Sequence, residues 1–466
     1  MPLAEELQSI IKGDIDTTAA GLEAASHDAS IFEVRPQVVA SPKTVEDIQK
    51  LVQYATDHPG VTLTARSAGT DMSGGPLSQS VVVDFLKYFD HIKKVGEGYA
   101  VTEPGVYYRD FDKATLERGF IMPSYPASRE ICTVGGMVAN NSGGEKTLTY
   151  SKTERYIRRL KMVCADGKEH EFKSLTLSEL EQYKKFPTFE SEIYRKMHEL
   201  ITHNHELIQA AKPKVSKNSC GYYLWNVMDM EKGTFDLCKM IVGSQGTLGL
   251  ITEIEFSLIK PKKHSRLLVV FLKDLKLLAE TASHILKYKP ESFESYDDHT
   301  FKVAVKFLPQ LIRQMGGNIL KLGLSFLPEV LAVLRGGVPK LVLMAEFTAD
   351  TEEEALRLAT EAQDSLKALH EESRVTQDEA DAHKYWVIRR ESFNMLRHHV
   401  KDLRTAPFID DFAVLPERLP EFLPKLYSIL DQYNLTYTIA GHVGDGNFHI
   451  IPLMDLHQTH SHDVIK

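Results

Sequence analysis

The chain has 466 residues, of which 43% are hydrophobic and 26% charged, and a formal net charge of −9. This composition is typical of a water-soluble protein of two or three domains, and the negative charge argues against broad nucleic-acid binding. The acidic, polar start does not resemble a secretion signal. The most apolar segment, Gly317 to Val338, is interrupted by charged residues, so we predict a core helix there and at most peripheral membrane contact. We expect a cytoplasmic protein, with any membrane contact confined to the inner face.

The first part of the chain predicts α+β structure, because short apolar runs alternate with turns and one amphipathic helix. The helix is expected to begin at Thr44, with Asp47 completing a capping box. An Asp-Gly turn within residues 160–168 predicts a β-hairpin. Residues 251–258 alternate apolar and polar side chains, which predicts a strand with one wet face. Further strands are predicted over residues 36–40, 61–65 and 81–83.

Two segments, Arg66 to Gly75 and Thr133 to Gly144, are unusually rich in Gly, Ser, Thr and Asn. We predict that both are loops rather than interiors of helices or strands. Bare backbone N–H groups in such loops form concave anion sites, and glycine lets the main chain approach a ligand closely. Two of them in one half of the chain therefore predict a long ligand with two anionic or polar ends.

A charged hinge at residues 261–264 marks a change of pattern. Beyond it, strands such as 267–272 and 341–347 alternate with long helices such as 351–369. We therefore place a domain boundary there, with one domain over residues 1–262 and a second over residues 263–466.

Four segments carry a resemblance to a known family. They are the Arg66 loop, the segment Pro123 to Ser128 with the Thr133 loop that follows, Asn218 to Tyr222, and Gly243 to Gly249. In this order they closely resemble the FAD-binding domain of the vanillyl-alcohol-oxidase and p-cresol-methylhydroxylase superfamily, and most of all the FAD-linked D-lactate, glycolate and D-2-hydroxyglutarate dehydrogenases. The resemblance covers about residues 35 to 455. It implies an α+β fold, in which a two-subdomain FAD-binding domain of the p-cresol-methylhydroxylase type precedes a substrate-binding cap domain with a large antiparallel sheet.

The resemblance implies that the loops of the first domain bind FAD. We expect loop N–H groups to hold its pyrophosphate, the glycine pair 135–136 to leave room for ligand atoms, and the polar residues after it to bond the ribityl chain or the ring. Relatives often bind FAD covalently through a histidine in the first loop, and this loop has none, so we predict non-covalent FAD. Gln245 stands where relatives commonly carry glutamate. The predicted FAD-binding residues are Arg66, Ser67, Ala68, Gly69, Thr70, Asp71, Met72, Ser73, Pro123, Ser128, Thr133, Gly135, Gly136, Ala139, Asn140, Asn141, Ser142, Gly143, Gly246, Gly249 and Ile251.

The second domain contains the segment Ala440 to His449, in which a tight turn can bring His442 and His449 to one side. Neutral imidazoles suit a divalent ion such as zinc or manganese, which would polarise a substrate hydroxyl. The alternative is a histidine-containing hairpin without an ion. The segment resembles the H-x-G-D-G-N-x-H element of the D-2-hydroxyacid dehydrogenases, which implies a catalytic role for both histidines and for Asn447.

Residues 385–392 are expected on a helix, and their Trp-x-x-Arg pattern matches the family element whose arginine binds the substrate carboxylate. This implies that role for Arg389, with Arg390 as the second choice and a solvated helix face as the alternative. The strand expected at 408–414 has no lysine where enzymes of 2-hydroxyglutarate carry one, which argues against a dicarboxylate unless Lys401 or Arg404 substitutes.

The resemblance implies FAD-dependent oxidation of a small D-2-hydroxy acid, such as D-lactate, to the 2-oxo acid by hydride transfer to flavin N5. The electron acceptor stays open among a quinone, oxygen and a partner redox protein. Relatives continue beyond the histidine segment with a Ser-Gly-Glu-His-Gly element that supplies a metal ligand and a base, so we expect either a fragment or an incomplete site. Two alternatives remain: an FAD-dependent oxidase of another alcohol or a carbohydrate, and a non-catalytic FAD-binding electron-transfer subunit.

Overall fold

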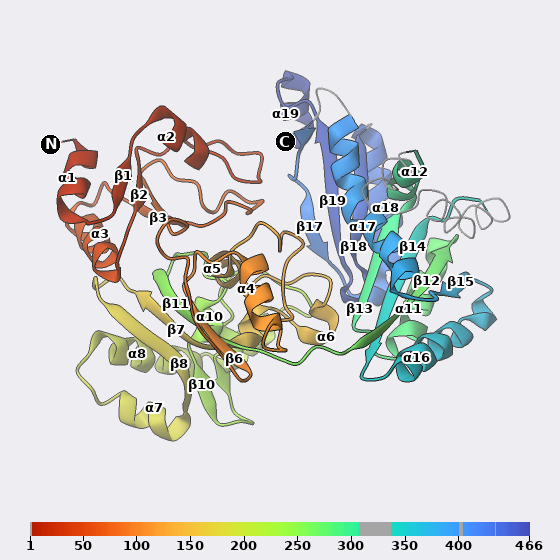
Figure 1. The fold of residues 1–466 in the computed structure, drawn as a ribbon, viewed down its shortest axis with the longest axis horizontal. Coiled ribbons are helices and arrows are strands. Elements are labelled where there is room, and N and C mark those ends of the chain that lie inside the picture. Colours follow the sequence, from red (N-terminus) through yellow and green to blue (C-terminus); the bar gives the residue numbers. More distant parts are fainter. Residues whose placement is uncertain (1, 307–336, 400–403, 434) are drawn as a thin grey trace. The chain divides into compact units, whose positions relative to one another are not determined.

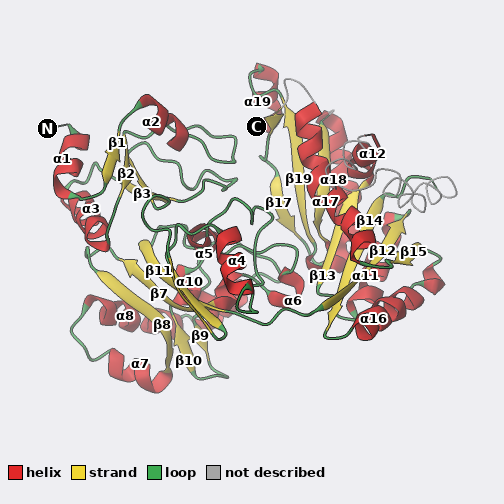
Figure 2. Cartoon of the chain, viewed as in Figure 1, coloured by secondary structure: helices red, strands yellow, loops and turns green. Residues whose placement is uncertain are grey.

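The computed structural model describes residues 2–306, 337–399, 404–433 and 435–466 (Figures 1 and 2). It divides into two compact units. The apolar segment Gly317 to Val338 lies outside the described residues except for its last two. Unit 1 comprises Met1–Gly144, Ser151–Pro213 and Ser219–Pro261, and unit 2 comprises Glu145–Tyr150, Lys214–Asn218 and Lys262–Lys466.

The first sheet of unit 1 has four strands in the order β1 (Asp14–Asp16), β2 (Val38–Ser41), β4 (Val81–Asp84) and β3 (Leu63–Arg66). Strands β2, β4 and β3 are parallel, and β1 is antiparallel to β2. Helices α1 (Leu3–Ile10) and α3 (Val45–Asp57) bury Leu7, Ile48 and Leu51 in the same apolar core as β4. The sheet therefore ends at Arg66 directly before the first glycine-rich segment. The short helix α2 (Ala19–Ala25) follows β1.

Helix α3 begins as predicted, since the Thr44 side chain accepts the N–H of Asp47. The predicted capping box is wrong. The Asp47 carboxylate accepts the N–H groups of Lys12, Gly13 and Lys43, and so it fixes the preceding chain instead of the helix start.

The second sheet of unit 1 is antiparallel, and its order is β5 (Ile92–Gly96), β6 (Tyr99–Thr102), β11 (Leu250–Ser257), β7 (Ile157–Val163), β8 (Glu169–Thr176), β10 (Thr234–Asp236) and β9 (Met228–Asp229). Strands β7 and β8 form the hairpin predicted around the Asp-Gly turn. β11 shows the alternation predicted for residues 251–258 from Ile254 onward, because Ile254 and Phe256 are buried while Glu255 and Ser257 are partly exposed. Its Glu253 is buried and forms ion pairs with Lys93 (2.8 Å) and Arg159 (2.9 Å).

Helices complete unit 1. Tyr194 of α8 (Phe189–His203) packs against Phe172 and Phe235 of the second sheet. The remaining α-helices in the described part of unit 1 are α4 (Tyr108–Leu116), α5 (Val134–Asn140), α7 (Leu177–Tyr183), α9 (His205–Ala211) and α10 (Cys238–Ile241).

Helix α5 corrects the prediction that the second glycine-rich segment is a loop. Thr133 caps its start, and Asn141 ends it in the left-handed conformation with φ of 54°. A side chain at Gly135 would meet the backbone of Pro104 at 2.6 Å, so this glycine permits close packing of the helix. Gly135 and Gly136 therefore lie in a tightly packed helix, while Gly143 and Gly144 lie beyond its end.

Unit 2 is built on one antiparallel sheet, in the order β15 (Glu372–Val375), β12 (His264–Leu272), β14 (Leu341–Ala349), β13 (Ser292–Asp297), β18 (Thr436–His442), β19 (Asn447–Met454) and β16 (Arg404–Thr405), with β17 (Asp410–Ala413) also paired to β19. Alternate residues of β12 enter different cores. Leu268 and Val270 pack with α11 (Leu278–Leu286), α16 (Glu352–Ser365) and α18 (Leu419–Leu430). Leu267 and Val269 pack with α12 (Asp298–Lys306) and α17 (Glu379–His399). The sheet is therefore covered on both faces.

Two short segments join unit 2 from within the first half of the sequence. Residues 145–150, which include α6 (Thr147–Tyr150), are held by bonds of Lys146 and Tyr150 to Glu291. Residues 214–218 are held at the β18–β19 turn, as described below. The chain ends in α19 (Thr459–Ile465).

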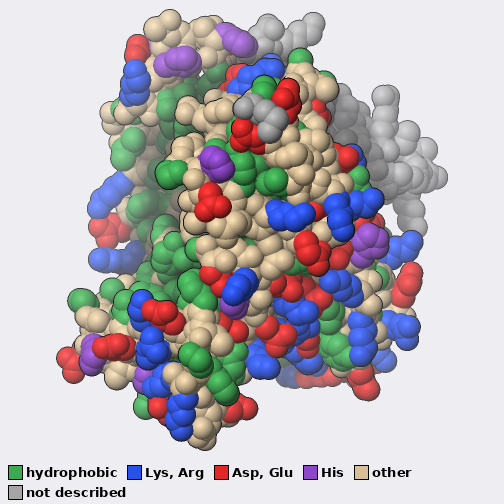
Figure 3. All heavy atoms as spheres, turned by 90° about the vertical axis from the view of Figure 1, so that its left-hand side faces the viewer, with side chains coloured by type: hydrophobic (Ala, Val, Ile, Leu, Met, Phe, Trp, Pro, Cys, Tyr) green, Lys and Arg blue, Asp and Glu red, His purple; other side chains and the backbone are tan. Residues whose placement is uncertain are grey.

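The α+β fold with a large antiparallel sheet is confirmed. No helix in the described ranges is long and apolar enough to cross a membrane. On the face shown in Figure 3, acidic and basic side chains are interspersed, so no broad field of one sign forms there.

Candidate functional site

The first glycine-rich segment is held open by its own side chains. The Arg66 guanidinium donates to the carbonyls of Ala24 (3.3 Å), Ala25 (3.4 Å) and His27 (2.5 Å). The Asp71 carboxylate accepts the N–H of Gly75 at 2.6 Å. Both charged side chains of the segment thus brace the backbone. An FAD contact of Arg66 would therefore need its backbone or guanidinium N–H groups other than those bonded here.

The backbone between these two braces has free donors. Within the residues that the structure describes, no protein acceptor takes any N–H from Ser67 to Ser73. Gly69 adopts φ of +65°, which turns the chain in the way that anion-binding nests require. These seven consecutive donors fit a diphosphate group, which needs many hydrogen bonds and no particular side chain.

The start of α5 is different, because the protein itself uses its donors. Val134 donates to Val106 O (2.9 Å), Gly135 donates to Pro104 O (2.8 Å), and Gly136 donates to Thr133 Oγ1 (3.3 Å). A side chain at Gly136 would meet Ser67 Oγ at 2.9 Å, so α5 lies against the first segment. The space predicted for ligand atoms at Gly135 is taken by Pro104.

The residues after α5 divide into braces and free polar groups. Asn141 is 1% exposed, and its amide is bonded to the Glu154 side chain and backbone N–H. Asn140 is exposed and accepts only the Ser142 hydroxyl in the described structure, so its amide N–H groups are available to a ligand. Of the two predicted asparagines, only Asn140 keeps its amide N–H groups free of protein partners in the described structure.

The fourth motif, residues 243–249, docks onto the end of α5. Gly243 donates to Val138 O and Gln245 donates to Ala139 O, both at 2.9 Å. A side chain at Gly246 would meet Ala65 of β3 at 3.7 Å. The first loop, α5 and this motif therefore converge at the end of β3. Among the other predicted residues, Pro123 is buried, Ser128 accepts backbone N–H groups in a turn, and Ile251 lies in β11 beyond Gly249.

The predicted histidine pair lies in unit 2 on the hairpin β18–β19. His442 pairs with Asn447 across the hairpin, and Ala440 pairs with His449. His442 and Ala440 are two residues apart, so the two imidazoles share one face of the sheet. Their Nε2 atoms are 3.3 Å apart. The tight turn closes through Gly446, whose φ is +64°. A side chain at this position would clash with the backbone carbonyl of Val414.

Each imidazole is backed by a carboxylate. His442 Nδ1 lies 2.6 Å from Glu294 Oε1, and Glu294 of β13 is 1% exposed. His449 Nδ1 lies 3.3 Å from Asp411 Oδ1 of β17. Asn447, also 1% exposed, donates to the Asp411 carboxylate and to Phe412 O (2.9 Å). The pair thus has the carboxylate–histidine arrangement that orients imidazoles as metal ligands.

Burial sets the protonation of these groups. It holds the pKa of His442 well below the ordinary value, and the charges of Lys217 and Arg389 lower it further. Burial also lowers the pKa of His449 to about 3, although Asp411 opposes the shift. Both rings are therefore neutral near pH 7. Burial raises the pKa of Glu294 to about 8, against the attraction of Arg389.

The distance between the rings fits a shared cation. Where the Nδ1–H of each ring donates to its carboxylate, the two Nε2 lone pairs face each other. Two imidazole nitrogens about 2.05 Å from one tetrahedral zinc ion are about 3.3 Å apart. The observed separation of 3.3 Å matches that value, and it also matches a direct hydrogen bond between the two rings.

Helix α17 brings Arg389, rather than Arg390, into this cluster. Arg389 Nη2 lies 3.2 Å from Glu294 Oε2, while its buried Nε has no hydrogen-bond partner in the part described. Arg390 stacks over Trp386 and pairs with Glu145 at 2.6 Å and 2.8 Å. Arg389 is thus already paired with one buried carboxylate, which the sequence did not indicate.

The structure adds Glu294 and Lys217 to the residues identified from the sequence. Lys217 Nζ donates to Asn447 Oδ1 at 2.9 Å. It directly precedes the motif at 218–222, so its position beside a recognised motif was an available signal. Glu294 is an acidic residue in a strand whose six residues are all buried, and a charge inside such a strand needs a partner.

The segment 408–414, considered for a second substrate carboxylate, contains no basic residue. Ile409 packs against an apolar core, and Asp411 pairs with the His449 imidazole. Arg404 is exposed on β16, whereas Lys401 lies outside the described residues.

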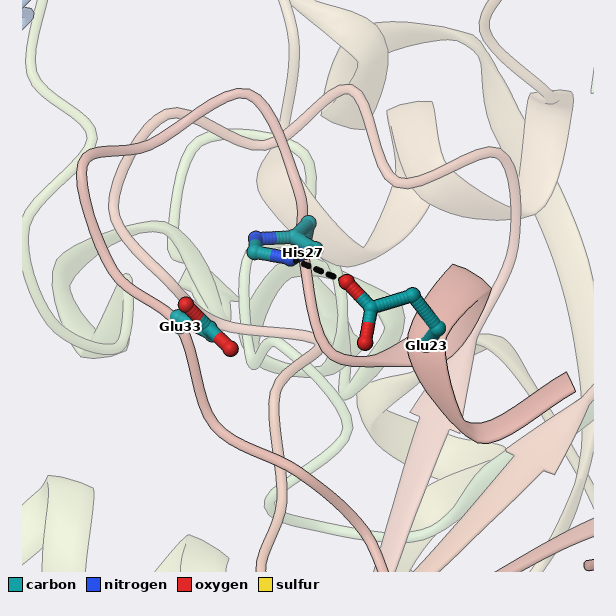
Figure 4. Close-up of side chains that lie close together, drawn as sticks. All are labelled: Glu23, His27 and Glu33. Carbon is teal, nitrogen blue, oxygen red and sulfur yellow. Dashed lines mark hydrogen bonds and ion pairs between the residues drawn. The ribbon is translucent and has the colours of Figure 1, made fainter. Parts of the chain in front are cut away.

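A second group of possible metal ligands, Glu23, His27 and Glu33, lies on the surface of unit 1 (Figure 4). His27 Nε2 is 3.2 Å from Glu23 Oε1, and Glu23 also pairs with Arg35 at 3.3 Å. All three side chains are exposed, so water and Arg35 already compensate their charge. We interpret this group as a surface ion-pair cluster.

Comparison with known proteins identifies two family domains in the chain. Residues 36–173 match the FAD binding domain family, and residues 261–465 match the FAD linked oxidases, C-terminal domain. D-2-hydroxyglutarate dehydrogenase of Pseudomonas putida is 24% identical over 96% of this chain and 44% of its own length. D-lactate dehydrogenase of Archaeoglobus fulgidus is 24% identical over 90% of this chain and 75% of its own length. The chain thus spans less than half the length of some of its curated relatives.

A solved structure of p-cresol methylhydroxylase with substrate bound shares the fold, with a TM-score of 0.67 and 15% identity over 99% of this chain and 85% of that one. The matched FAD binding domain defines an FAD-binding protein. The chain carries an FAD binding domain and the C-terminal domain of FAD linked oxidases, and the resemblance predicted from its motifs is confirmed. FAD as its cofactor is likewise confirmed.

Proposed function

We propose that the protein oxidises a small D-2-hydroxy acid, similar to D-lactate, to the 2-oxo acid. The observation that carries this proposal is the cluster of His442, His449 and Arg389 in unit 2, within a chain whose unit 1 carries an FAD-binding domain. The names of the related D-2-hydroxyglutarate and D-lactate dehydrogenases support the substrate class.

FAD supplies the hydride acceptor, and in this proposal it is bound without a covalent link. The N–H groups from Ser67 to Ser73 bind its diphosphate, and the exposed Asn140 amide bonds polar atoms of the same molecule. The first segment contains no histidine that could attach the flavin.

The Nε2 atoms of His442 and His449 would hold a divalent ion, zinc or manganese, which polarises the substrate hydroxyl. Glu294 and Asp411 keep the two rings in position by binding Nδ1. Because both rings are neutral near pH 7, their lone pairs are available to a cation or to a hydroxyl proton. Asn447 fixes Asp411 and so supports the second ring.

The substrate carboxylate is proposed to bind Arg389. Glu294 occupies one terminal nitrogen of this guanidinium, but its Nε is buried without an acceptor in the described part of the chain. A carboxylate would satisfy that donor. Because no lysine occupies the strand around Ile409, we favour a monocarboxylate over a dicarboxylate. The reduced flavin would then pass electrons to a quinone, to oxygen or to a partner redox protein.

The test is an anaerobic absorbance spectrum of the flavin-loaded protein mixed with D- and L-forms of lactate, glycerate and 2-hydroxyglutarate. The proposal expects bleaching by D-lactate or another small D-acid, with the L-form at least 10-fold slower, and an oxo acid released in equal amount. A flavin that dithionite bleaches but that no 2-hydroxy acid reduces would contradict the proposal and favour a non-catalytic FAD-binding subunit.

A further inference from the structure

Lys217 reaches the histidine cluster from a different part of the sequence. Its segment, residues 214–218, belongs to unit 2 and is fixed by the Ser216 hydroxyl, which donates to Asp445 O at 3.0 Å. Lys217 Nζ donates to Asn447 Oδ1 at 2.9 Å. Asn447 in turn holds Asp411, the carboxylate behind His449. The ammonium group is therefore positioned in the same cluster as the two imidazoles.

The positive charge of Lys217 lacks a direct counter-charge. Among the described residues it forms no ion pair, and its one side-chain hydrogen bond goes to a neutral amide. The charges of Asp445, Asp411 and Glu294 act on Lys217 without forming an ion pair with it. Glu294 bonds His442 and Arg389, and Asp411 bonds Asn447 and His449. Burial lowers the pKa of Lys217, as expected for an ammonium group that water solvates poorly.

Arg389 and Lys217 differ in how their charges are balanced. The two cations are close enough for the Arg389 charge to lower the pKa of Lys217. Arg389 contacts the carboxyl group of Glu294 at 3.2 Å, whereas Lys217 contacts no carboxyl group among the described residues. An unpaired, poorly hydrated cation is stabilised by an anionic ligand with hydrogen-bond acceptors. A substrate carboxylate meets both conditions, and the ammonium group has two further N–H donors beyond the one that Asn447 uses.

We propose that Lys217 is a substrate-binding residue that pairs directly with the carboxylate of the 2-hydroxy acid, while Arg389, held by Glu294, contributes its remaining donors. This inference rests on the proposed function, because it names the group that selects a charged acid at that site. The alternative is a purely structural lysine that only anchors Asn447.

The experiment compares the full chain, loaded with flavin, as wild type, Lys217→Met and Lys217→Arg. Lys214→Met is the matched control, because it lies in the same segment and its side chain is exposed. Each protein is assayed with D-lactate and with D-lactamide, which keeps the hydroxyl but has no charge. Loss of a charge-assisted hydrogen bond predicts about a 30-fold lower kcat/KM for D-lactate in Lys217→Met, mostly through KM. The value for D-lactamide should change less than about 3-fold, Lys217→Arg should lose less than Lys217→Met, and Lys214→Met should behave as wild type.

An equal loss on both substrates would overturn the inference, because it would indicate a structural lysine. Unchanged kinetics of Lys217→Met on D-lactate would overturn it as well. If Lys217→Met does not fold, Lys217→Gln is interpreted by the same two criteria. If the wild type oxidises no 2-hydroxy acid, the proposed function fails, and oxamate binding measured by calorimetry then decides the inference separately. Oxamate binding that is about 30-fold weaker in Lys217→Met than in the wild type would support a carboxylate-binding role of Lys217. No oxamate binding to the wild type, or equal binding to both proteins, would contradict that role.

Discussion

The two units bind in different physical ways. Unit 1 offers backbone N–H groups from Ser67 to Ser73, while the charged side chains of that loop brace the chain. Unit 2 offers side chains, namely two imidazoles and two cations, each oriented by a buried or bonded partner. The first site therefore depends on backbone conformation, and the second depends on individual functional groups.

Because of this difference, the two sites should respond differently to amino-acid substitution. A diphosphate bound by seven amides loses little when one side chain changes, but it loses much when the chain path changes. A site of few charged groups responds in the opposite way, because removing one partner leaves another buried group unpaired. Substitutions in the two units should accordingly separate flavin binding from turnover.

The largest effect is expected from His449→Ala in unit 2. It removes one of the two facing Nε2 atoms and leaves Asp411 without its imidazole. Loss of the group that polarises or deprotonates the hydroxyl predicts about a 10³-fold fall in kcat for the hydroxy acid. Metal content, measured by mass spectrometry after dialysis, should fall from about one ion per chain, while flavin content stays at the wild-type level. His460→Ala, an exposed histidine of α19, is the control. A variant that keeps full turnover would remove the histidine pair from the mechanism.

A smaller effect, limited to flavin, is expected from Gly69→Val in unit 1. Gly69 has φ of +65°, and an added Cβ would lie 2.5 Å from the Arg66 guanidinium that braces the loop. Strain of about 1–3 kcal/mol predicts FAD binding weaker by about 5-fold to 150-fold. Thr70→Val, which alters a side chain in the same loop and leaves the glycine intact, should bind FAD within about 3-fold of wild type. Fluorescence titration of the apoprotein with FAD measures both dissociation constants. Much weaker FAD binding in Thr70→Val, with unchanged binding in Gly69→Val, would show that side chains and not the backbone path determine binding in this loop.

How much the sequence predicted also differs between the two units. Glycine-rich motifs are local, so the resemblance located the FAD loops from short segments. It did not show that Asn141 braces Glu154 or that Gly135 packs on Pro104, since those contacts depend on tertiary structure. In unit 2, the spacing of His442 and His449 predicted a shared face correctly. Glu294 and Lys217 lie 148 and 225 residues from His442 in the sequence, and only the sheet and the segment at 214–218 bring them there.

The smallest effect concerns the free energy of unfolding, and it tests whether a buried carboxylate destabilises unit 2. Burial raises the pKa of Glu346, on β14, to about 7 from an ordinary value of 4.5, although Lys146 opposes the shift and Glu291 adds to it. Between those two pH values the folded protein binds more protons than the unfolded chain, so stability falls as pH rises through this window and levels off above it. Glu346→Gln removes the titration, and it should be more stable than wild type by on the order of 2 kcal/mol at pH 8 but nearly equal to it at pH 5. Thermal unfolding at the two pH values measures the difference, with Glu353→Gln on the exposed face of α16 as the control. A gain that is equal at both pH values would mean that packing, and not the carboxylate charge, limits stability at this position.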